Sequence, residues 1–312
     1  MDRKTPLVII TGPTGSGKTA IALKLARSYP IEVISADSMQ VYRYMDIATA
    51  KPTSDEQSLL THHLIDIVDP DEEFNAEMFS TQASEKITEI LSRKKIPVIV
   101  GGTGLYIKAL VYGLAPAPPR SAKLRGCLRD LIERKGSVYL WHFLERIDPE
   151  IAVKINKNDS LRIVRSMEIL FLTGMKPSRV YREHGFANPR YQARTVCVMP
   201  DRGKLYEDIN ARVVSMVETG LIDETKRLLQ RGFSPNLRSM QTLAYKHMID
   251  YLEEKIGLEA TVGRIQRDTR NYAKRQITWM RSNYGRDFFH TADEALKIVP
   301  LWLDEQGKPA TG

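Results

Sequence analysis

The spacing of hydrophobic positions changes along the chain. Short apolar runs at 7–12 (LVIITG), 32–38 (EVISADS), 62–68 (HHLIDIV) and the first part of 94–113 (KKIPVIVGG) predict four strands. The residues after Lys18, TAIALKLARSYP, have helical spacing, as does GLYIKALVYG after the fourth run. Strands that alternate with helices indicate a doubly wound parallel sheet, which is an α/β fold.

The pattern changes near Leu114. APAPPRS at 115–121 is rich in proline and predicts a linker, and from about 122 to 174 every segment has helical spacing, with Gly174 at the expected helix end. ARTVCVMP at 193–200 predicts another strand, and helices dominate from 201 to about 286. We therefore expect a P-loop NTPase-like parallel sheet core with a helical C-terminal part, formed by 1–114 and 193–312. An all-α insertion domain at 115–192 interrupts it.

Composition places the chain among ordinary globular proteins, with 42% hydrophobic and 27% charged residues. It has no apolar run long enough to span a membrane, and MDRKTP leaves no room for a signal peptide before the first strand, so we expect a cytoplasmic protein. Cys127 and Cys197 match no metal spacing and are expected to be free thiols. With 46 basic and 38 acidic residues the net charge is +8, which suits a polyanionic partner without identifying one.

The stretch GPTGSGKT fits the phosphate-binding pattern G-x-x-x-x-G-K-[ST] between a strand and a helix. Backbone N–H groups and the helix N-terminus bind phosphate oxygens in such loops, while Lys18 adds a positive charge and the Thr19 hydroxyl can bind Mg²⁺. We therefore expect a diphosphate or triphosphate and a Mg²⁺ cofactor. The predicted binding residues are Gly12, Pro13, Thr14, Gly15, Ser16, Gly17, Lys18 and Thr19. The pattern does not identify what the phosphates are attached to.

Other polar residues lie at predicted strand ends, where parallel sheets bind ligands. Asp37 follows the second strand and either caps the next helix or serves as a carboxylate that accepts a proton or holds Mg²⁺. Thr103 follows the fourth strand after two glycines, which permit either close approach of a ligand or a sharp entry into the helix. Asp66 is a further Mg²⁺ candidate, whereas His62 and His63, being adjacent on a strand, point to opposite faces and are not expected to share a metal.

The segment RIQRDTRNYAKRQITWMR at 264–281 carries a basic stripe. At helical spacing, one arc contains six basic residues and only Asp268 as an acid at its edge, while Ile265, Tyr272, Trp279 and Met280 cover the opposite side. The basic residues are Arg264, Arg267, Arg270, Lys274, Arg275 and Arg281. Solvated helix faces usually mix both charge signs, so this stripe favours a nucleic acid partner.

Taken together, several ordered stretches resemble the family of tRNA dimethylallyltransferases, also called tRNA isopentenyltransferases. They run over nearly the whole chain: GPTGSGKT, DSMQVYRYMDIATAKP, HHLIDIVDP, PVIVGGTGLYIKAL, NDSLRIVRSMEI and AKRQITWMR. The resemblance implies transfer of a dimethylallyl group from its diphosphate to N6 of an adenosine beside the anticodon, at tRNA position 37. It implies dimethylallyl diphosphate and the anticodon stem-loop of tRNA as partners, and we expect a monomer.

The resemblance also implies roles for particular residues. Asp37 corresponds to the catalytic base, with Lys18 and Thr14 as further catalytic residues that stabilise or face the leaving diphosphate. The implied tRNA-binding residues are Asp37, Ser38, Met39, Gln40, Thr103, Leu161, Arg162, Ile163, Val164, Arg165, Gln241, Thr242, Leu243, Ala244, Tyr245, Lys246, Lys274, Arg275, Gln276, Ile277, Thr278, Trp279, Met280 and Arg281.

Three positions depart from the family pattern, which usually has glycine where Tyr44, Ala48 and Ala244 stand. The two alanines bear on local turn geometry, and the bulk of Tyr44 bears on the path of the chain after Gln40. Three other functions remain open: prenylation of a free adenine nucleotide, a P-loop small-molecule kinase, and a non-catalytic RNA-binding NTPase module. A free nucleotide would not require the basic helix or the inserted helices, a kinase would need an arginine-rich lid that is not evident, and the third would leave Asp37 unexplained.

Overall fold

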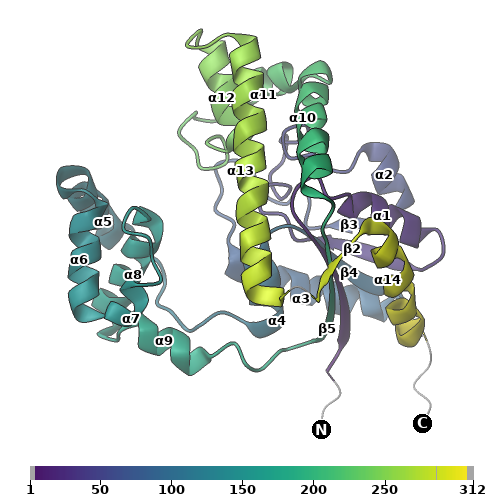
Figure 1. Cartoon of the computed structure of the whole chain (residues 1–312), viewed down its shortest axis with the longest axis horizontal. Coiled ribbons are helices and arrows are strands. Elements are labelled where there is room, and N and C mark those ends of the chain that lie inside the picture. The colour runs from purple at the N-terminus through teal and green to yellow at the C-terminus, as the bar shows by residue number, and fades with distance from the viewer. Residues whose placement is uncertain (1–3, 286, 308–312) are drawn as a thin grey trace. The chain divides into compact units, whose positions relative to one another are not determined.

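A computed structural model describes residues 4–285 and 287–307 (Figure 1). Across those residues the strands form one parallel sheet in the order β3-β2-β4-β1-β5-β6. Their bounds are β1 Pro6–Thr11, β2 Ile31–Ser35, β3 His62–His63, β4 Ile96–Gly101, β5 Gln192–Val198 and β6 Phe289–His290. The predicted α/β class with a parallel sheet is confirmed, and the strand that leads into the phosphate loop lies between β4 and β5.

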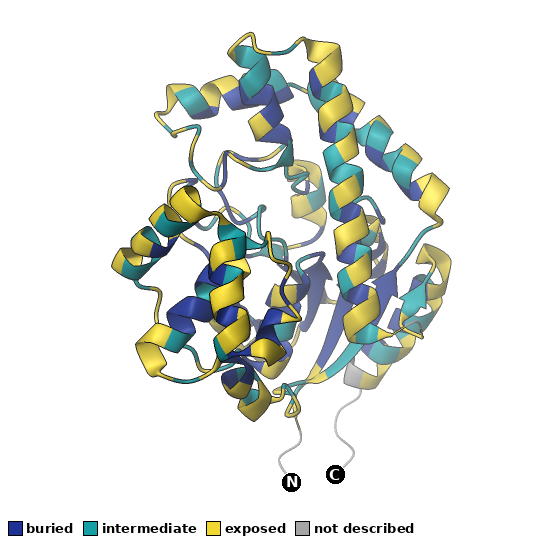
Figure 2. Cartoon of the chain, turned by 60° about the vertical axis from the view of Figure 1, so that its left-hand side comes forward, coloured by how far each residue is buried: buried dark blue, intermediate teal, exposed yellow. Residues whose placement is uncertain are grey.

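The central strands are buried on both faces because helices cover the sheet (Figure 2). Helices α1 (Lys18–Ala26) and α14 (Ala292–Gly307) share one core with alternate strand residues such as Val8 and Val98. Residues that point the other way, such as Ile9, lie on the face opposite α1, and α3 (Ala76–Ser92) packs on β2 and β4. The remaining helices of this unit are α2 Ser54–Leu59, α4 Gly104–Tyr112, α10 Arg202–Glu218, α11 Leu221–Gln230, α12 Leu243–Leu252 and α13 Leu258–Tyr284.

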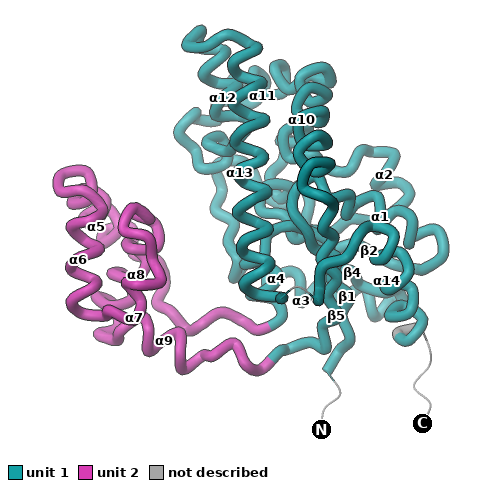
Figure 3. The backbone as a smooth tube through the Cα atoms, in the orientation of Figure 1, with its two compact units in different colours: residues 1–111, 189–312 teal, residues 112–188 magenta. Residues whose placement is uncertain are grey.

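The chain divides into two compact units, one formed by 1–111 with 189–312 and the other by 112–188 (Figure 3). The second unit contains α5 Ala122–Lys135, α6 Ser137–Ile147, α7 Pro149–Ala152, α8 Ser160–Thr173 and α9 Pro177–His184. It has its own core, which includes Leu128, Leu144, Ile163 and Met167. Helix α8 ends at Gly174 in the left-handed conformation, at the position that the sequence predicts.

A buried carboxylate joins the first and fourth helices of this second unit. Glu168 is fully buried and accepts hydrogen bonds from the Ser121 N–H at 2.7 Å, Arg125 at 2.9 Å and Arg165 at 2.5 Å. Although burial raises the pKa of Glu168, hydrogen bonds from both arginines and the Ser121 N–H lower it to about 2. Arg165 also donates to the Pro118 carbonyl, so its guanidinium stabilises the helical unit itself.

One predicted strand needs correction, and several elements were not predicted. The strand predicted over 62–68 is only His62–His63, because Leu64 and Asp66 have φ of 61° and 56°, and Val68 forms a single bridge with Tyr42. The helices predicted from 201 to 286 are confirmed by α10 to α13, but the sequence interpretation did not identify α2, α3, α9, β6 or α14.

Candidate active site around the phosphate-binding loop

The phosphate loop connects β1 to α1 and brings Lys18 back over its own backbone. The Lys18 Nζ donates to the carbonyls of Gly12 at 3.0 Å and Pro13 at 2.7 Å. Burial lowers the pKa of Lys18 to about 8, the charge of Asp37 opposes this shift, and the charge of Arg212 adds to it. Lys18, Asp37 and Arg212 therefore belong to one electrostatic cluster. Arg212, on α10, was not identified from the sequence because its helix begins 183 residues after the loop ends.

Asp37 lies two residues beyond the end of β2, and the structure brings it beside Thr103. Its Oδ1 accepts the Met39 N–H at 2.8 Å, the Ser38 N–H donates to Thr103 Oγ1 at 3.1 Å, and the Thr103 N–H donates to the Ala36 carbonyl at 3.1 Å. Asp37 thus closes a tight turn of its own and does not begin a helix. The turns that follow β2 and β4 are therefore in direct contact.

The charge of the Asp37 carboxylate affects the pKa of two tyrosines. Burial raises the pKa of Tyr106 and Tyr272 above the ordinary range, and the negative charge of Asp37 raises both further. Tyr272 is on α13 and Tyr106 is on α4, so Asp37 lies within electrostatic reach of both helices. Asp37 therefore has two buried phenols and two cations, Lys18 and Arg212, within electrostatic reach.

The glycines after β4 allow other parts of the protein to approach closely. A Cβ on Gly102 would lie 2.5 Å from Gln276 Nε2, and one on Gly104 would lie 2.1 Å from the ring of Trp279. Gln276 Oε1 accepts the Thr14 N–H at 2.9 Å, and its Nε2 donates to the Gly102 carbonyl at 3.0 Å. Helix α13 is therefore joined to both the phosphate loop and the turn that carries Thr103.

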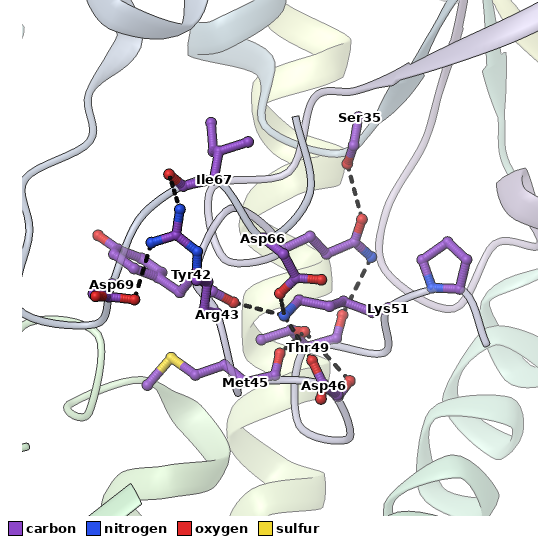
Figure 4. A network of polar contacts seen from close by, with 12 residues as sticks. Ser35, Tyr42, Arg43, Met45, Asp46, Thr49, Lys51, Asp66, Ile67 and Asp69 are labelled. Carbon is purple, nitrogen blue, oxygen red and sulfur yellow. Dashed lines mark hydrogen bonds and ion pairs between the residues drawn. The ribbon is translucent and has the colours of Figure 1, made fainter. Parts of the chain in front are cut away.

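The segment after Asp37 has no regular secondary structure and is held by polar contacts (Figure 4). The buried Lys51 Nζ donates to the Tyr42 carbonyl at 2.6 Å, Asp46 at 2.7 Å and Asp66 at 2.5 Å. Asp66 is thus an ion-pair partner of Lys51. Gln40 accepts from the Ser35 hydroxyl at 2.8 Å and donates to the Ala50 carbonyl at 3.1 Å, so its side chain also holds the loop.

Glu224, a buried acid on α11, also holds the segment that follows Asp37. Glu224 is 3% exposed and accepts the N–H groups of Asp46 at 2.9 Å, Ile47 at 2.8 Å and Ala48 at 3.2 Å. It also accepts the Tyr245 hydroxyl at 2.6 Å. We call Glu224 and these four donors the Glu224 cradle. No sequence signal pointed to it, because an acid near a helix N-terminus ordinarily lies in solvent.

The departures from the family pattern have local structural settings. Tyr44 has φ of 66°, a conformation that favours glycine, and its ring stacks on Phe233 with Arg231 4.1 Å from the ring centre. The Ala48 N–H donates to Glu224, and the φ of Ala48 is not positive. Ala244 is buried on α12. The chain therefore keeps the left-handed turn at 44 with an aromatic residue.

The exposed side of α13 carries most of the predicted basic stripe. Arg264, Arg267, Lys274, Arg275 and Arg281 are exposed, as helical spacing predicts. Arg270 is half-buried and donates to Asn210 Oδ1 at 2.5 Å, so it also joins α13 to α10. Asp268 accepts hydrogen bonds from His247 and Arg267. Because the exposed basic residues outnumber this one acid, the face is strongly positive.

Some of the residues implied as tRNA contacts are exposed, some are buried, and the remaining ten are partly exposed. The exposed group is Leu161, Arg162, Gln241, Lys246, Lys274, Arg275, Thr278 and Arg281. The buried group is Ile163, Val164, Ala244, Tyr245, Gln276 and Met280. Side chains in the buried group pack inside the protein. Leu161 to Arg165 lie in the helical unit and the others lie in the sheet unit.

The remaining predictions concern the two cysteines, a metal site and membrane-spanning helices. Cys127 and Cys197 are free thiols, and burial raises the pKa of Cys197 to about 12. Across residues 4–285 and 287–307, no three His, Cys, Asp or Glu side chains are grouped to hold a metal ion. None of the helices in the same residues is long and apolar enough to cross a membrane.

Comparison with known proteins decides the family. The family model described as IPP transferase matches residues 40–283. The chain belongs to the IPP transferase family. It is 44% identical over 277 residues to tRNA dimethylallyltransferase 1 of Pelobacter propionicus, covering 89% of this chain and 90% of the relative. The tRNA dimethylallyltransferase of Carboxydothermus hydrogenoformans is 44% identical over 310 residues, covering 96% and 97%.

Solved structures of family members have the same fold. The full-length tRNA isopentenylpyrophosphate transferase of Bacillus halodurans matches with a TM-score of 0.70 and 38% identity, covering 97% of this chain and 98% of that one. A eukaryotic dimethylallyltransferase acting on tRNA matches with a TM-score of 0.81 and 28% identity, covering 99% and 81%. The predicted family and its P-loop-like fold are confirmed.

Proposed function

We propose that this protein transfers the dimethylallyl group of dimethylallyl diphosphate to N6 of the adenosine at tRNA position 37, giving N6-(dimethylallyl)adenosine. The observation that carries the proposal is the electrostatic cluster of Lys18, Asp37 and Arg212 at the phosphate loop of an IPP transferase family member. It combines cations for a diphosphate with a carboxylate for a proton. The exposed basic face of α13 supplies a surface for RNA.

The reaction requires one bond to form and one to break. The adenine N6 attacks the allylic carbon, the carbon–oxygen bond breaks, and the diphosphate leaves with the electron pair. Asp37 accepts the N6 proton. Loop N–H groups, Lys18 and Arg212 stabilise the charge that develops on the leaving group, with Thr14 facing the substrate. When bound at Thr19, Mg²⁺ supplies further charge neutralisation for the diphosphate.

The acceptor must bring a single base to Asp37. An adenine within a tRNA loop reaches a recessed carboxylate when it is flipped out of its stack. We propose that the exposed residues on α13 and on α8 bind the tRNA backbone and that the buried group supports them. We further propose that the protein acts as a monomer in the cytoplasm.

An acceptor panel tests the proposal. Purified protein is incubated with Mg²⁺, labelled dimethylallyl diphosphate and, separately, tRNA, AMP or ATP. We expect label in tRNA alone, because neither nucleotide can engage the α13 basic face. Label in AMP without label in tRNA would instead identify a free-nucleotide prenyltransferase, and phosphate transfer from ATP would identify a kinase.

A variant of the base tests the role of Asp37 separately. Asp37→Ala is expected to abolish turnover while tRNA binding persists, because the carboxylate is the proton acceptor and the hydrogen bond that it accepts closes only one small turn. Asp55→Ala, which removes an exposed aspartate from α2, is the matched control. A near-normal rate for Asp37→Ala would refute the assignment.

A further inference from the structure

The side chain of Gln276 connects α13 to two parts of the phosphate site. Its amide oxygen accepts the Thr14 N–H at 2.9 Å, and its amide nitrogen donates to the Gly102 carbonyl at 3.0 Å. The residue is 9% exposed. Gln276 lies in the stretch that family resemblance assigns to tRNA, but both ends of its amide are used inside the protein.

We propose that Gln276 is a positioning residue for the diphosphate substrate, and that its side chain holds the phosphate loop rather than the tRNA. The inference rests on the proposed function. An amide is suited to this position because it offers an acceptor to one segment and a donor to the other. Methionine has a similar length and offers neither.

The contacts of Gln276 extend to both halves of the candidate site. On one side the amide fixes Thr14, whose N–H is in the phosphate loop. On the other side it fixes Gly102, and the next residue, Thr103, accepts the Ser38 N–H beside Asp37. One side chain therefore sets the separation between the diphosphate site and the proton acceptor.

The close approach leaves no space for a base or phosphate between Gln276 and the turn. A Cβ on Gly102 would lie 2.5 Å from the Gln276 nitrogen, and 3.1 Å from the Gly12 carbonyl. Glycine at 102 is thus required by the position of the amide. The exposed neighbours Lys274 and Arg275 remain on the other side of α13, so the same helix can bind RNA while it holds the loop.

The test replaces the amide with an apolar group of similar length. Gln276→Met is compared with Gln266→Met, a glutamine on the same helix that donates to the Asn210 carbonyl of α10 instead. Steady-state KM and kcat are measured with dimethylallyl diphosphate and with tRNA, together with the tRNA Kd and the urea midpoint. We expect Gln276→Met to raise KM for dimethylallyl diphosphate by about tenfold or more and to leave the tRNA Kd within about twofold, because loop geometry is lost without a tRNA contact.

Gly102→Ala perturbs the same bond from its other partner and gives a second measurement if Gln276→Met does not fold. We expect it to raise KM for the diphosphate as well, because its Cβ displaces the amide. A weakened tRNA Kd with unchanged diphosphate KM would overturn the inference and restore a tRNA contact. A lowered urea midpoint with unchanged kinetics would also overturn it, as would equal effects in Gln266→Met. If the unmodified protein transfers no label to tRNA, the proposed function fails instead.

Discussion

The Glu224 cradle leads to a quantitative prediction for Glu224→Gln. The carboxylate accepts three backbone N–H groups and one hydroxyl, with two donors on each oxygen: Asp46 and Ile47 on Oε2, and Ala48 and Tyr245 on Oε1. A glutamine keeps one oxygen and turns an NH₂ group toward the other pair. Two buried donors then lose their acceptor.

Each unsatisfied buried donor costs about 1–3 kcal/mol, so the substitution should destabilise the segment by about 2–6 kcal/mol. Domain stabilities are about 5–15 kcal/mol, so this is a large part of the total. The segment is open to water on the side of Asp46, whose side chain is 61% exposed, so we expect it to open locally before the sheet unfolds.

Hydrogen exchange of the amides at 46–48 measures this opening directly. Their protection should fall by about 30-fold or more, since 2 kcal/mol corresponds to roughly that factor. The matched control is Asp223→Asn, which removes an acid from the same turn of α11 where the side chain is exposed. Equal protection in both variants, or a fall confined to the sheet amides, would refute the cradle as the device that holds this segment.

Three further predictions follow from charge. Because the pKa of Lys18 is about 8, kcat/KM for dimethylallyl diphosphate should fall as pH rises through 8, and a flat profile to pH 9 would contradict this. Burial raises the pKa of Glu32, but hydrogen bonds from His63, Lys95 and Arg93 lower it from 4.5 to about 2. The contribution of ionised Glu32 to the free energy of unfolding is therefore complete above pH 4.5 and is lost as pH falls through 2. Glu32→Gln should therefore flatten the urea-midpoint profile over that acid range, and an unchanged slope would contradict it. Lys274→Gln with Arg281→Gln should reduce the salt slope of tRNA binding by about 1 per residue, whereas Lys86→Gln on α3 should not, and equal slopes would contradict the role of α13.

The features that the sequence alone located depend on local sequence. The phosphate loop is contiguous, Asp37 follows its strand directly, and the basic stripe is a repeat along one helix, so each is visible in a short window. The strand predicted over 62–68 was wrong beyond His63 because an apolar run does not reveal left-handed φ values at Leu64 and Asp66. Such values come from the surrounding contacts rather than from hydrophobic spacing.

The contacts that were missed join residues that are distant in the chain. Gln276 binds Thr14 across 262 positions, and Glu224 binds Asp46 across 178. A single sequence shows neither pairing, because a polar residue on an amphipathic helix carries no sign of the group it contacts. The family resemblance located the stretches that contain Gln276 and Tyr245 but not the buried direction of their side chains.

The central claim is that the phosphate loop holds the leaving group and that a tRNA adenosine beside the anticodon is the acceptor. The most direct measurement maps the product after reaction with labelled dimethylallyl diphosphate, by digesting the tRNA and separating its nucleosides. We predict that the label is in N6-(dimethylallyl)adenosine from position 37 and disappears when guanosine replaces adenosine there. Label at another nucleoside, or label that persists in the guanosine-substituted tRNA, would contradict the account.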